Sequence, residues 1–287
     1  LNADIWGRPS GPTILRDSNP GSVTLTPGGV GRNIAHDLCL LGLDVSLVSA
    51  VGDDSNGEFL LDRCRSLGMD VSRVRVVPGA RSSSYLYITD ERGDMQLAVN
   101  DMAVCNEISP EYLERVLPGI QAGALVLDTN LPVESLEFIC RSTSIQLYAD
   151  PVSSVKAMKL RGVMKHLRAI KPNAIEAAAL TGQSDPEFAA RALIDEGVQR
   201  VFISLGTNGM IAAEGSRILR MPSPEANVVN ATGAGDAAMS AIVWADLHGL
   251  SLEDSARAAQ LAGAITCASE ESNAPELSRL PGLLAAE

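Results

Sequence analysis

A run of small residues before an Ala-rich stretch offers a binding place for an anion. Gly233, Ala234 and Gly235 are followed by Asp236, where the apolar pattern of a helix begins. The backbone N–H groups at a helix start converge, and the helix dipole favours negative charge there. An Asp in the first turn is often only a helix cap. Beside a phosphate or oxyanion cradle it can also take a proton from an attacking hydroxyl.

A second glycine segment, residues 26–33, leads into another helix. Its glycine spacing differs from the dinucleotide-binding pattern, and the strand and ribose-binding acid of that pattern are missing. One reading is a plain turn. In the functional reading, Gly28 and Gly29 let a polar ligand approach the backbone, and Asn33 offers a donor and an acceptor to its hydroxyls.

Two further segments carry groups that suit a nucleotide and its metal. Asn173 and Glu176 lie one helical turn apart, so their side chains share a face. Mg²⁺ keeps several waters and needs only one or two such oxygens, but an ordinary capped helix start has the same residues. The turn from Ser204 to Gly209 follows a strand and either holds nucleotide phosphates or reverses the chain.

Short apolar strands alternate with amphipathic helices along the chain. We expect strands at 45–51, 124–127, 146–149, 169–170 and 200–204, a β pair around 214–217, and helices at 33–41, 58–67, 133–141, 155–167, 173–180, 186–196, 235–247 and 252–269. This alternation predicts a parallel sheet covered on both faces. Two β-rich stretches, 13–26 and 73–99, predict a small antiparallel sheet that closes over a cleft as a lid.

Composition excludes several classes of protein. The 287 residues include 35 acidic and 23 basic side chains, and the net charge of −12 repels nucleic acid and anionic membranes. No stretch reaches the roughly 18 apolar residues of a membrane span, and residues 1–16 lack a signal-peptide pattern. We expect a cytoplasmic protein. The five cysteines and three histidines lack metal-site spacing, so free thiols are expected.

The motifs occur in the order seen in ribokinase-like (PfkB-type) carbohydrate kinases, and the resemblance covers nearly the whole chain. It is carried by the glycine segment ending in Asn33, by Gly52-Asp53, by Asn173 with Glu176, and by residues 204–206 and 233–236. Within the family, residues 17–21, 26–35, 83–86, 100–102, 150–153 and 230–236 are similar to those of the pseudouridine kinase subgroup.

The resemblance implies a three-layer α/β/α body with a mainly parallel sheet and a β lid. One domain would span residues 1–287, with the lid formed by about 9–27 and 73–101. The family also has a strand before Asn2, which is largely absent here. ATP would be the phosphoryl donor, with Mg²⁺ and, in some members, K⁺ as cofactors.

The resemblance also assigns roles to residues. The catalytic group would be Asp236 as base with Gly233, Ala234 and Gly235 as anion hole. The acceptor would be bound by Asp4, Asp17, Gly28, Gly29, Asn33, Ser84, Asn100, Asp101 and Lys156. The nucleotide would be bound by Asn173, Ser204, Gly206, Gly209 and Gln260. Glu176 would hold Mg²⁺ through water, and Asn230, which replaces the family's usual Asp, would line a monovalent-cation site with Thr232.

These roles lead to one function and its alternatives. The leading hypothesis is transfer of the γ-phosphoryl group of ATP to the 5′-hydroxyl of pseudouridine. Alternatives within the family are kinases of ribose, of another nucleoside or of a keto-sugar acid. From another class, the alternative is a catalytically silent protein that binds a metabolite as a regulator. The expected partner is a small molecule, and exposed lid strands can pair two subunits into a homodimer.

Overall fold

The body of the protein is built on a six-stranded sheet. The structure is a computed structural model that describes residues 1–285. The strands are β7 (Ala124–Asp128), β8 (Gln146–Asp150), β9 (Leu167–Ile170), β10 (Arg200–Ser204), β11 (Met210–Glu214) and β12 (Arg217–Met221), in the order β12-β11-β10-β9-β8-β7. The four from β7 to β10 are parallel, and β11 and β12 add antiparallel pairs. The predicted parallel core is confirmed.

A separate parallel pair lies beside this sheet. Strands β3 (Ser46–Gly52) and β4 (Asp70–Val77) are joined through helix α2 (Ser55–Ser66). A cavity of about 740 Å³ lies between β3 and β7, and Leu1 and Asn2 stand at its rim. The chain passes from this rim directly into the first lid strand.

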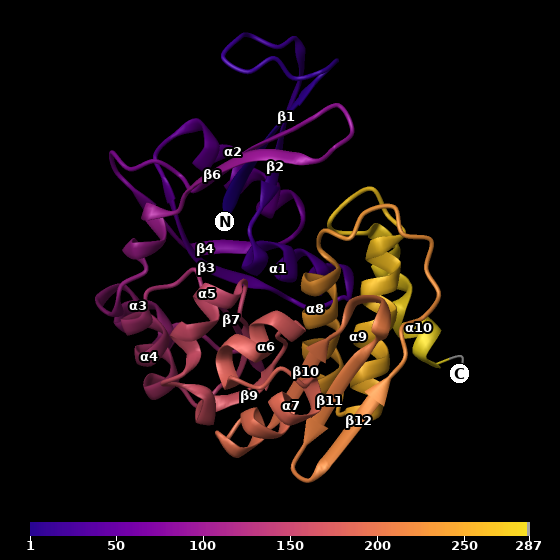
Figure 1. Cartoon of the computed structure of the whole chain (residues 1–287). Coiled ribbons are helices and arrows are strands. Elements are labelled where there is room, and N and C mark those ends of the chain that lie inside the picture. The colour runs from indigo at the N-terminus through magenta and orange to yellow at the C-terminus, as the bar shows by residue number, and fades with distance from the viewer. Residues whose placement is uncertain (286–287) are drawn as a thin grey trace.

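Helices cover both faces of the sheet (Figure 1). They are α1 (Val30–Leu40), α2, α3 (Pro110–Val116), α4 (Val133–Ser142), α5 (Ser154–Ala157), α6 (Ala174–Thr181), α7 (Pro186–Asp195), α8 (Ala234–Leu247), α9 (Leu252–Cys267) and α10 (Leu280–Ala285), with 3-10 helices at 103–107, 117–119, 158–160, 164–166, 206–208 and 275–279. Helices α3, α4, α6 and α7 pack on one face, and α1, α8 and α9 pack on the other. The three-layer α/β/α prediction is therefore confirmed.

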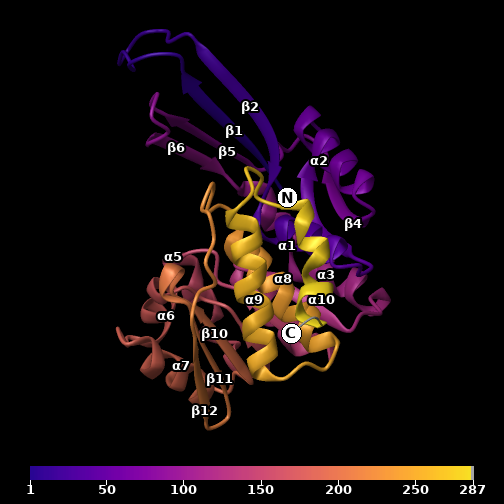
Figure 2. The same cartoon turned by 90° about the vertical axis from the view of Figure 1, so that its right-hand side faces the viewer.

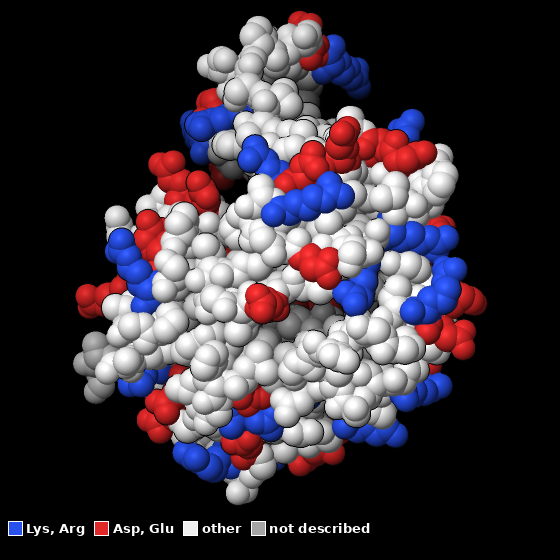
Figure 3. Space-filling model, turned by 180° about the vertical axis from the view of Figure 1, so that it is seen from behind, with Lys and Arg blue, Asp and Glu red and all other residues white. Residues whose placement is uncertain are grey.

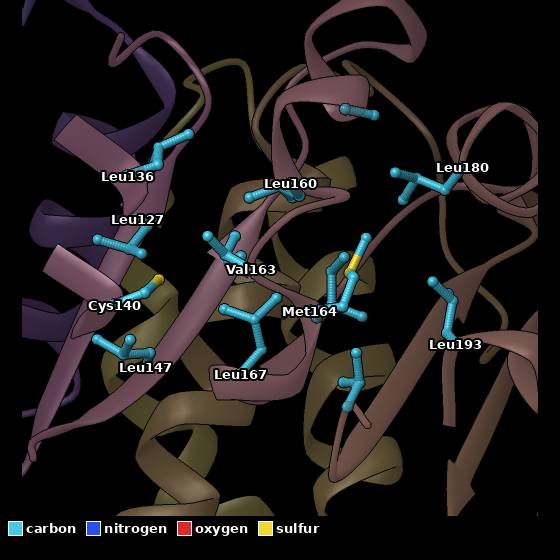
Figure 4. Close-up of a cluster of buried hydrophobic side chains, with 14 of the residues drawn as sticks. Leu127, Leu136, Cys140, Leu147, Leu160, Val163, Met164, Leu167, Leu180 and Leu193 are labelled. Atoms are coloured by element: carbon cyan, nitrogen blue, oxygen red, sulfur yellow. The ribbon is translucent and has the colours of Figure 1, made fainter. Parts of the chain in front are cut away.

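One predicted helix is wrong. Residues 155–167 form only the single turn α5 followed by 3-10 segments. Ala157, Leu160 and Val163 recur every third residue and are all buried, and a period of three is the repeat of a 3-10 helix. Figure 4 shows how Leu160, Val163 and their neighbours fill the space between strands and helices. Packing therefore decides the local conformation here.

The lid is a four-stranded sheet that projects from one end of the body (Figures 1 and 2). Its order is β2 (Gly21–Gly28), β1 (Asn2–Pro9), β5 (Ser84–Thr89) and β6 (Met95–Asp101). The prediction of an antiparallel sheet is wrong for one pair, since β1 and β5 are parallel. The strand β1 adds to the segments expected in the lid, and residues 73–77 pair with β3 instead.

A buried charged cluster ties the sheet to α8 away from the lid. Asp246 accepts two hydrogen bonds from Arg168, at 2.7 and 2.6 Å, and one from Arg200 at 3.0 Å. Arg200 also pairs with Glu214 at 2.7 Å. The cluster crosslinks β9, β10, β11 and α8 by ion pairs.

The outer surface carries mixed charge. On the face seen from behind in Figure 3, Lys and Arg are interspersed with Asp and Glu and do not gather into one patch. Among the described residues, no helix combines the length and the apolar character that crossing a membrane requires.

The core predicts a large difference between two substitutions in one segment. Leu160 is fully buried, whereas Val155 is 81% exposed. We expect Leu160→Ala to lower the free energy of unfolding by about 2–5 kcal/mol and the control Val155→Ala by at most about 0.5 kcal/mol. Urea unfolding followed by circular dichroism measures both. Equal losses would mean that residues 154–167 do not pack as described.

Candidate active site

The candidate active site lies where the parallel strands end and α8 begins. Asp236 is in the first turn of α8, and Asn33 from α1 donates a hydrogen bond from its amide to Asp236 Oδ2 at 2.8 Å. These two residues are 203 positions apart in the chain. The structure thus brings the predicted base and a predicted acceptor-binding residue into contact.

The environment of Asp236 suits a general base. Burial and the negative charge of Asp150 raise the pKa of the Asp236 carboxyl to about 7, while the bond from Asn33 and the charge of Lys171 act in the opposite direction. A base is most effective when its pKa lies near the working pH. Asp236 is the residue that the sequence predicts as the catalytic base, and a carboxyl pKa raised toward neutral pH is typical of functional carboxylates.

Lys171, together with Asp150, is a part of the site that sequence reasoning missed. The Lys171 ammonium is buried and lies 3.2 Å from Asp150 Oδ2. The charges of Asp150 and Asp236 raise the pKa of Lys171 against the effect of burial, so the side chain stays cationic. Both residues follow the ends of predicted strands, and that position was the available signal.

The predicted anion hole begins with Gly233, where the backbone conformation and a close contact leave no space for a side chain. Gly233 has φ +85°, and a Cβ atom there would lie 2.0 Å from the carbonyl oxygen of Ser272. A Cβ atom on Gly235 would lie 3.4 Å from the Lys171 ammonium. The N–H groups of Gly235 and Asp236 belong to the first turn of α8, where the helix offers them no acceptor. The Ala234 N–H lies 3.4 Å from the Ala231 carbonyl oxygen. The position of this helix start next to a buried cation agrees with the expected cradle, which stays a prediction.

Asp4 lies on β1, between β2 and β5 in the lid sheet. Burial raises the pKa of its carboxyl to about 6, and Asn2 donates a hydrogen bond to it. A Cβ atom on Gly28 would lie 2.1 Å from the Asp4 carboxylate, and Gly29 has φ +98°. Gly28 therefore leaves room for the Asp4 carboxylate, and Gly29 adopts a backbone conformation that favours glycine. The approach of a polar ligand to this backbone stays a prediction.

The lid presents an aromatic surface on the face that carries Asp4. Asp4 is paired with Tyr85, and Trp6 with Tyr87, and paired residues of neighbouring strands point to the same face. The rings of Trp6 and Tyr87 are stacked with centroids 6.2 Å apart, and those of Tyr85 and Tyr87 are 5.5 Å apart. The positive charge of Arg32 on α1 acts to lower the pKa of Asp4. This face of the lid is therefore directed toward the body.

The predicted lid residues lie at different places. Asn100 is paired with Tyr85 and shares the Asp4 face. Ser84 and Asp101 are paired with each other and with Ala3, on the opposite face. Asp17 is exposed and belongs to the loop of residues 10–20 between β1 and β2. This loop forms the far tip of the lid (Figure 1). The structure thus places Asn100 on the same face of the lid as Asp4, with β5 between them, and places Ser84, Asp101 and Asp17 elsewhere.

Lys156 has a defined partner near the site. Its ammonium donates a hydrogen bond to Asn130 Oδ1 at 2.6 Å, and Ser153 caps the short helix that carries it. Asp128, which precedes Asn130, accepts a hydrogen bond from the Gly31 N–H at 3.1 Å. Lys156 is thus held beside the ends of β7 and β8 rather than free in solvent.

Asn173 and Glu176 form a capping box at the start of α6. Asn173 Oδ1 accepts from the Glu176 N–H, and Glu176 Oε2 accepts from the Asn173 N–H, both at 2.9 Å. The capped helix start, one of the two readings of this pair, is therefore present. Burial raises the pKa of Glu176, and its second carboxylate oxygen takes no part in the box.

The expected nucleotide loop lies against this capping box. Ser204 forms a parallel bridge with Asn173, and its N–H donates to Pro172. Gly206 and Gly209 flank a single 3-10 turn, and a Cβ atom on Gly209 would lie 1.9 Å from the Met221 carbonyl oxygen. Gln260, on α9, donates to the Pro222 carbonyl oxygen at 3.1 Å, close in sequence to that contact.

Asn230 and Thr232 belong to a loop that is fastened to the end of α9. Asn230 donates to the Glu270 carbonyl oxygen at 3.1 Å and accepts from the Thr232 N–H at 2.9 Å. Within residues 1–285 no cluster of three His, Cys, Asp or Glu side chains suits a metal ion. A cation here would depend on backbone and amide oxygens.

The comparisons with known proteins agree with this geometry. The model of the pfkB family carbohydrate kinases matches residues 3–279. The chain is 37% identical to the pseudouridine kinase of Escherichia coli over 285 residues, which cover 96% of this chain and 91% of that protein.

This chain belongs to the PfkB family of carbohydrate kinases. The family consists of phosphotransferases that act on an alcohol group, as the resemblance implied. The ribokinase of Thermotoga maritima shares the fold with a TM-score of 0.88, at 20% identity and covering 100% of this chain and 97% of that one. A ribokinase II of Escherichia coli, solved with ATP and Mg²⁺, superposes with a TM-score of 0.81 at 18% identity, covering 100% and 98%. The predicted ribokinase-like fold with a lid sheet is confirmed.

The site predicts a marked effect of Asp236→Asn and a defined pH dependence. Turnover should fall about 10²–10⁴-fold because the amide cannot accept the proton. In the unsubstituted protein, activity should decline as the pH falls through about 7, where Asp236 becomes protonated. ATP-dependent turnover across pH 5–9 measures both, and ATP binding with the circular dichroism spectrum confirms that the variant folds. Near-normal turnover in a folded variant would exclude Asp236 as the base.

Proposed function

We propose that this protein phosphorylates the 5′-hydroxyl of pseudouridine to give pseudouridine 5′-phosphate. The observation that carries the choice of a nucleoside is the aromatic face of the lid, where Trp6, Tyr85 and Tyr87 share the side of Asp4. A nucleobase gains about 1–3 kcal/mol from stacking on such a ring, whereas a free sugar has no flat ring to stack. The identity to a pseudouridine kinase supports the particular nucleoside.

The residues divide the reaction between them. Asp4 and Asn33 hold the ribose hydroxyls so that the 5′-oxygen faces the γ-phosphorus of ATP. As that oxygen bonds to phosphorus, its proton passes to Asp236, the bond from phosphorus to the β,γ-bridging oxygen breaks, and ADP leaves. The N–H groups that follow Gly233 and the Lys171 ammonium stabilise the charge on the transferring phosphoryl group.

The residues that bind ATP lie around the capping box of Asn173 and Glu176. Asn173 and the loop from Ser204 to Gly209 bind ATP, with Gln260 near its base. The free carboxylate oxygen of Glu176 fits the preference of Mg²⁺ for oxygen ligands, and the ion when bound neutralises charge on the phosphates. Asn230 and Thr232 remain candidates for a K⁺ site. Lys156 lies where an acceptor or the phosphoryl group would meet a cation.

The alternatives differ in what they require of the site. A kinase of ribose or of a keto-sugar acid needs Asp4 and Asn33 but not the aromatic face. A silent regulator needs neither a base with a pKa near 7 nor a buried cation behind the anion hole. Turnover with pseudouridine, uridine, ribose and a keto-sugar acid separates the kinases from one another, and a silent regulator would turn over none of these compounds.

Discrimination between pseudouridine and uridine tests the proposal most sharply. Pseudouridine has a free ring N–H that uridine lacks, and a site that bonds this group leaves its own polar atom unpaired with uridine. We expect kcat/KM to favour pseudouridine by at least about tenfold and Asn100→Ala to remove most of this preference, because Asn100 lies beside Tyr85 on the inner face.

The matched control for this measurement is Ser84→Ala. Ser84 lies on the other face of the same strand pair, so the preference should persist in that variant. An enzyme that treats both nucleosides alike, or prefers ribose, would refute the proposed substrate and leave the kinase family intact.

The outer face of the lid supports the expected homodimer. It is formed by Ile5, Val23, Leu25, Leu86, Ile88, Leu97 and Val99, which share one side in the strand register. Val23, Leu97 and Val99 are 77%, 60% and 56% exposed. Contiguous apolar surface of this kind marks an interaction site, and a second copy of the same sheet is complementary to it.

A single charge on this face should therefore change the oligomeric state. We expect Val99→Glu to convert a dimer into a monomer in sedimentation velocity, because burying an unpaired carboxylate is costly. The control Phe188→Glu, at an exposed position on α7, should leave the dimer intact. A monomeric unsubstituted protein would refute pairing through the lid.

A further inference from the structure

A buried guanidinium connects the predicted acceptor-binding residue to the end of the chain. Arg32, in the first turn of α1, is 5% exposed. Its Nη1 atom donates to Asn33 Oδ1 at 2.8 Å and to Asn273 Oδ1 at 2.6 Å. Asn273 follows α9 and is also buried. Neither residue has a role in the reaction as described above.

The chemistry of Arg32 fixes which way two amides point. A guanidinium only donates hydrogen bonds, so the amide oxygens of Asn33 and Asn273 must both face it. Their NH₂ groups then face away. That of Asn33 reaches Asp236 Oδ2 at 2.8 Å, and that of Asn273 reaches Asp37 Oδ1 at 2.8 Å and the Asn33 carbonyl oxygen at 3.0 Å.

The orientation of the Asn33 amide matters to the base. With the amide turned over, its oxygen would face the Asp236 carboxylate, and two acceptors would oppose each other. In the observed orientation, the donated hydrogen bond favours the ionised carboxylate. This is the form that accepts the proton of the substrate hydroxyl.

We propose that Arg32 is a positioning residue, which holds Asn33 so that its amide donates to Asp236, while Asn273 keeps the guanidinium in place. The proposal rests on the proposed phosphotransfer, but it depends on Asp236 acting as base and not on which hydroxyl is phosphorylated. The plain alternative is that Arg32 merely fastens α1 to the segment that follows α9.

Other charged groups around Asp236 also influence the pKa of its carboxyl. The charged groups that face it come from α1 and from the ends of three strands, and they are Arg32, Asp37, Asp128, Asp150 and Lys171. Burial raises the pKa of Asp37 to about 8, and the charges of Asp4 and Asp236 also act on Arg32. Arg32 and Lys171 are the cations among these groups.

The test measures the ionisation of Asp236 directly. Carbon-13 NMR of labelled carboxyl groups gives the titration midpoint of Asp236, whose signal is assigned by its loss in Asp236→Asn. Arg32→Met keeps the length of the side chain and removes its donors. We expect the midpoint to rise by about one pH unit, and the acid limb of kcat/KM to move by the same amount.

A control variant and a double-substitution cycle distinguish the positioning role of Arg32 from a direct effect of its charge and from a loss of stability. Arg168→Met removes an arginine from the distant charged cluster and should lower the melting temperature without moving the midpoint. In an Asn33→Ala background, Arg32→Met should shift the midpoint far less than in the unsubstituted protein, because its effect passes through Asn33.

Each result decides the question. An unmoved midpoint in Arg32→Met, or shifts that simply add in the cycle, would overturn the positioning role. If Arg32→Met does not fold, Arg32→Lys enters the same cycle, since an ammonium keeps the charge but cannot bridge both amides in the guanidinium geometry. Absence of turnover in the unsubstituted protein would refute the proposed function and leave the NMR titration able to test Arg32.

Discussion

The site depends on the crowding of carboxylates around one buried ammonium. Asp150 and Asp236 come from different elements, yet both act on the charge of Lys171, which lies 3.2 Å from Asp150. Buried like charges raise one another's pKa values unless a cation stands between them. Lys171 is that cation, and its charge lowers the pKa of Asp236 against the effect of burial. The result is a carboxyl that is neither permanently ionised nor permanently protonated at neutral pH.

Close backbone approaches connect this centre to the rest of the molecule. Gly28 leaves space for the Asp4 carboxylate, and Gly233 leaves space for the Ser272 carbonyl oxygen. The first contact lies between the lid strand β1 and the end of β2, just before α1 begins. The second attaches the segment after α9 to the start of α8. Asn273 lies one residue beyond Ser272, so the same segment shapes the anion hole and holds Arg32.

The sequence was sufficient for residues whose role is local. The helix start at Asp236, the pair Asn173 and Glu176, and the alternation of strands and helices all follow from spacing of a few residues, and the structure contains each of them. Lys156 could be singled out from its distance to a strand end, but Lys171 could not be ranked above it. Which lysine lies near Asp236 depends on how strands that are far apart in the sequence are arranged in the sheet. A local sequence pattern does not contain this information.

The lid shows the same limit in another form. A period of two predicts strands but leaves open which residues of neighbouring strands face the same side, because a shift of one residue in register exchanges the faces. The parallel pairing of β1 with β5 sets Asp4 beside Tyr85 and Asn100, and sets Ser84 with Asp101 on the other side. The register therefore separates a polar and aromatic inner face from an apolar outer face.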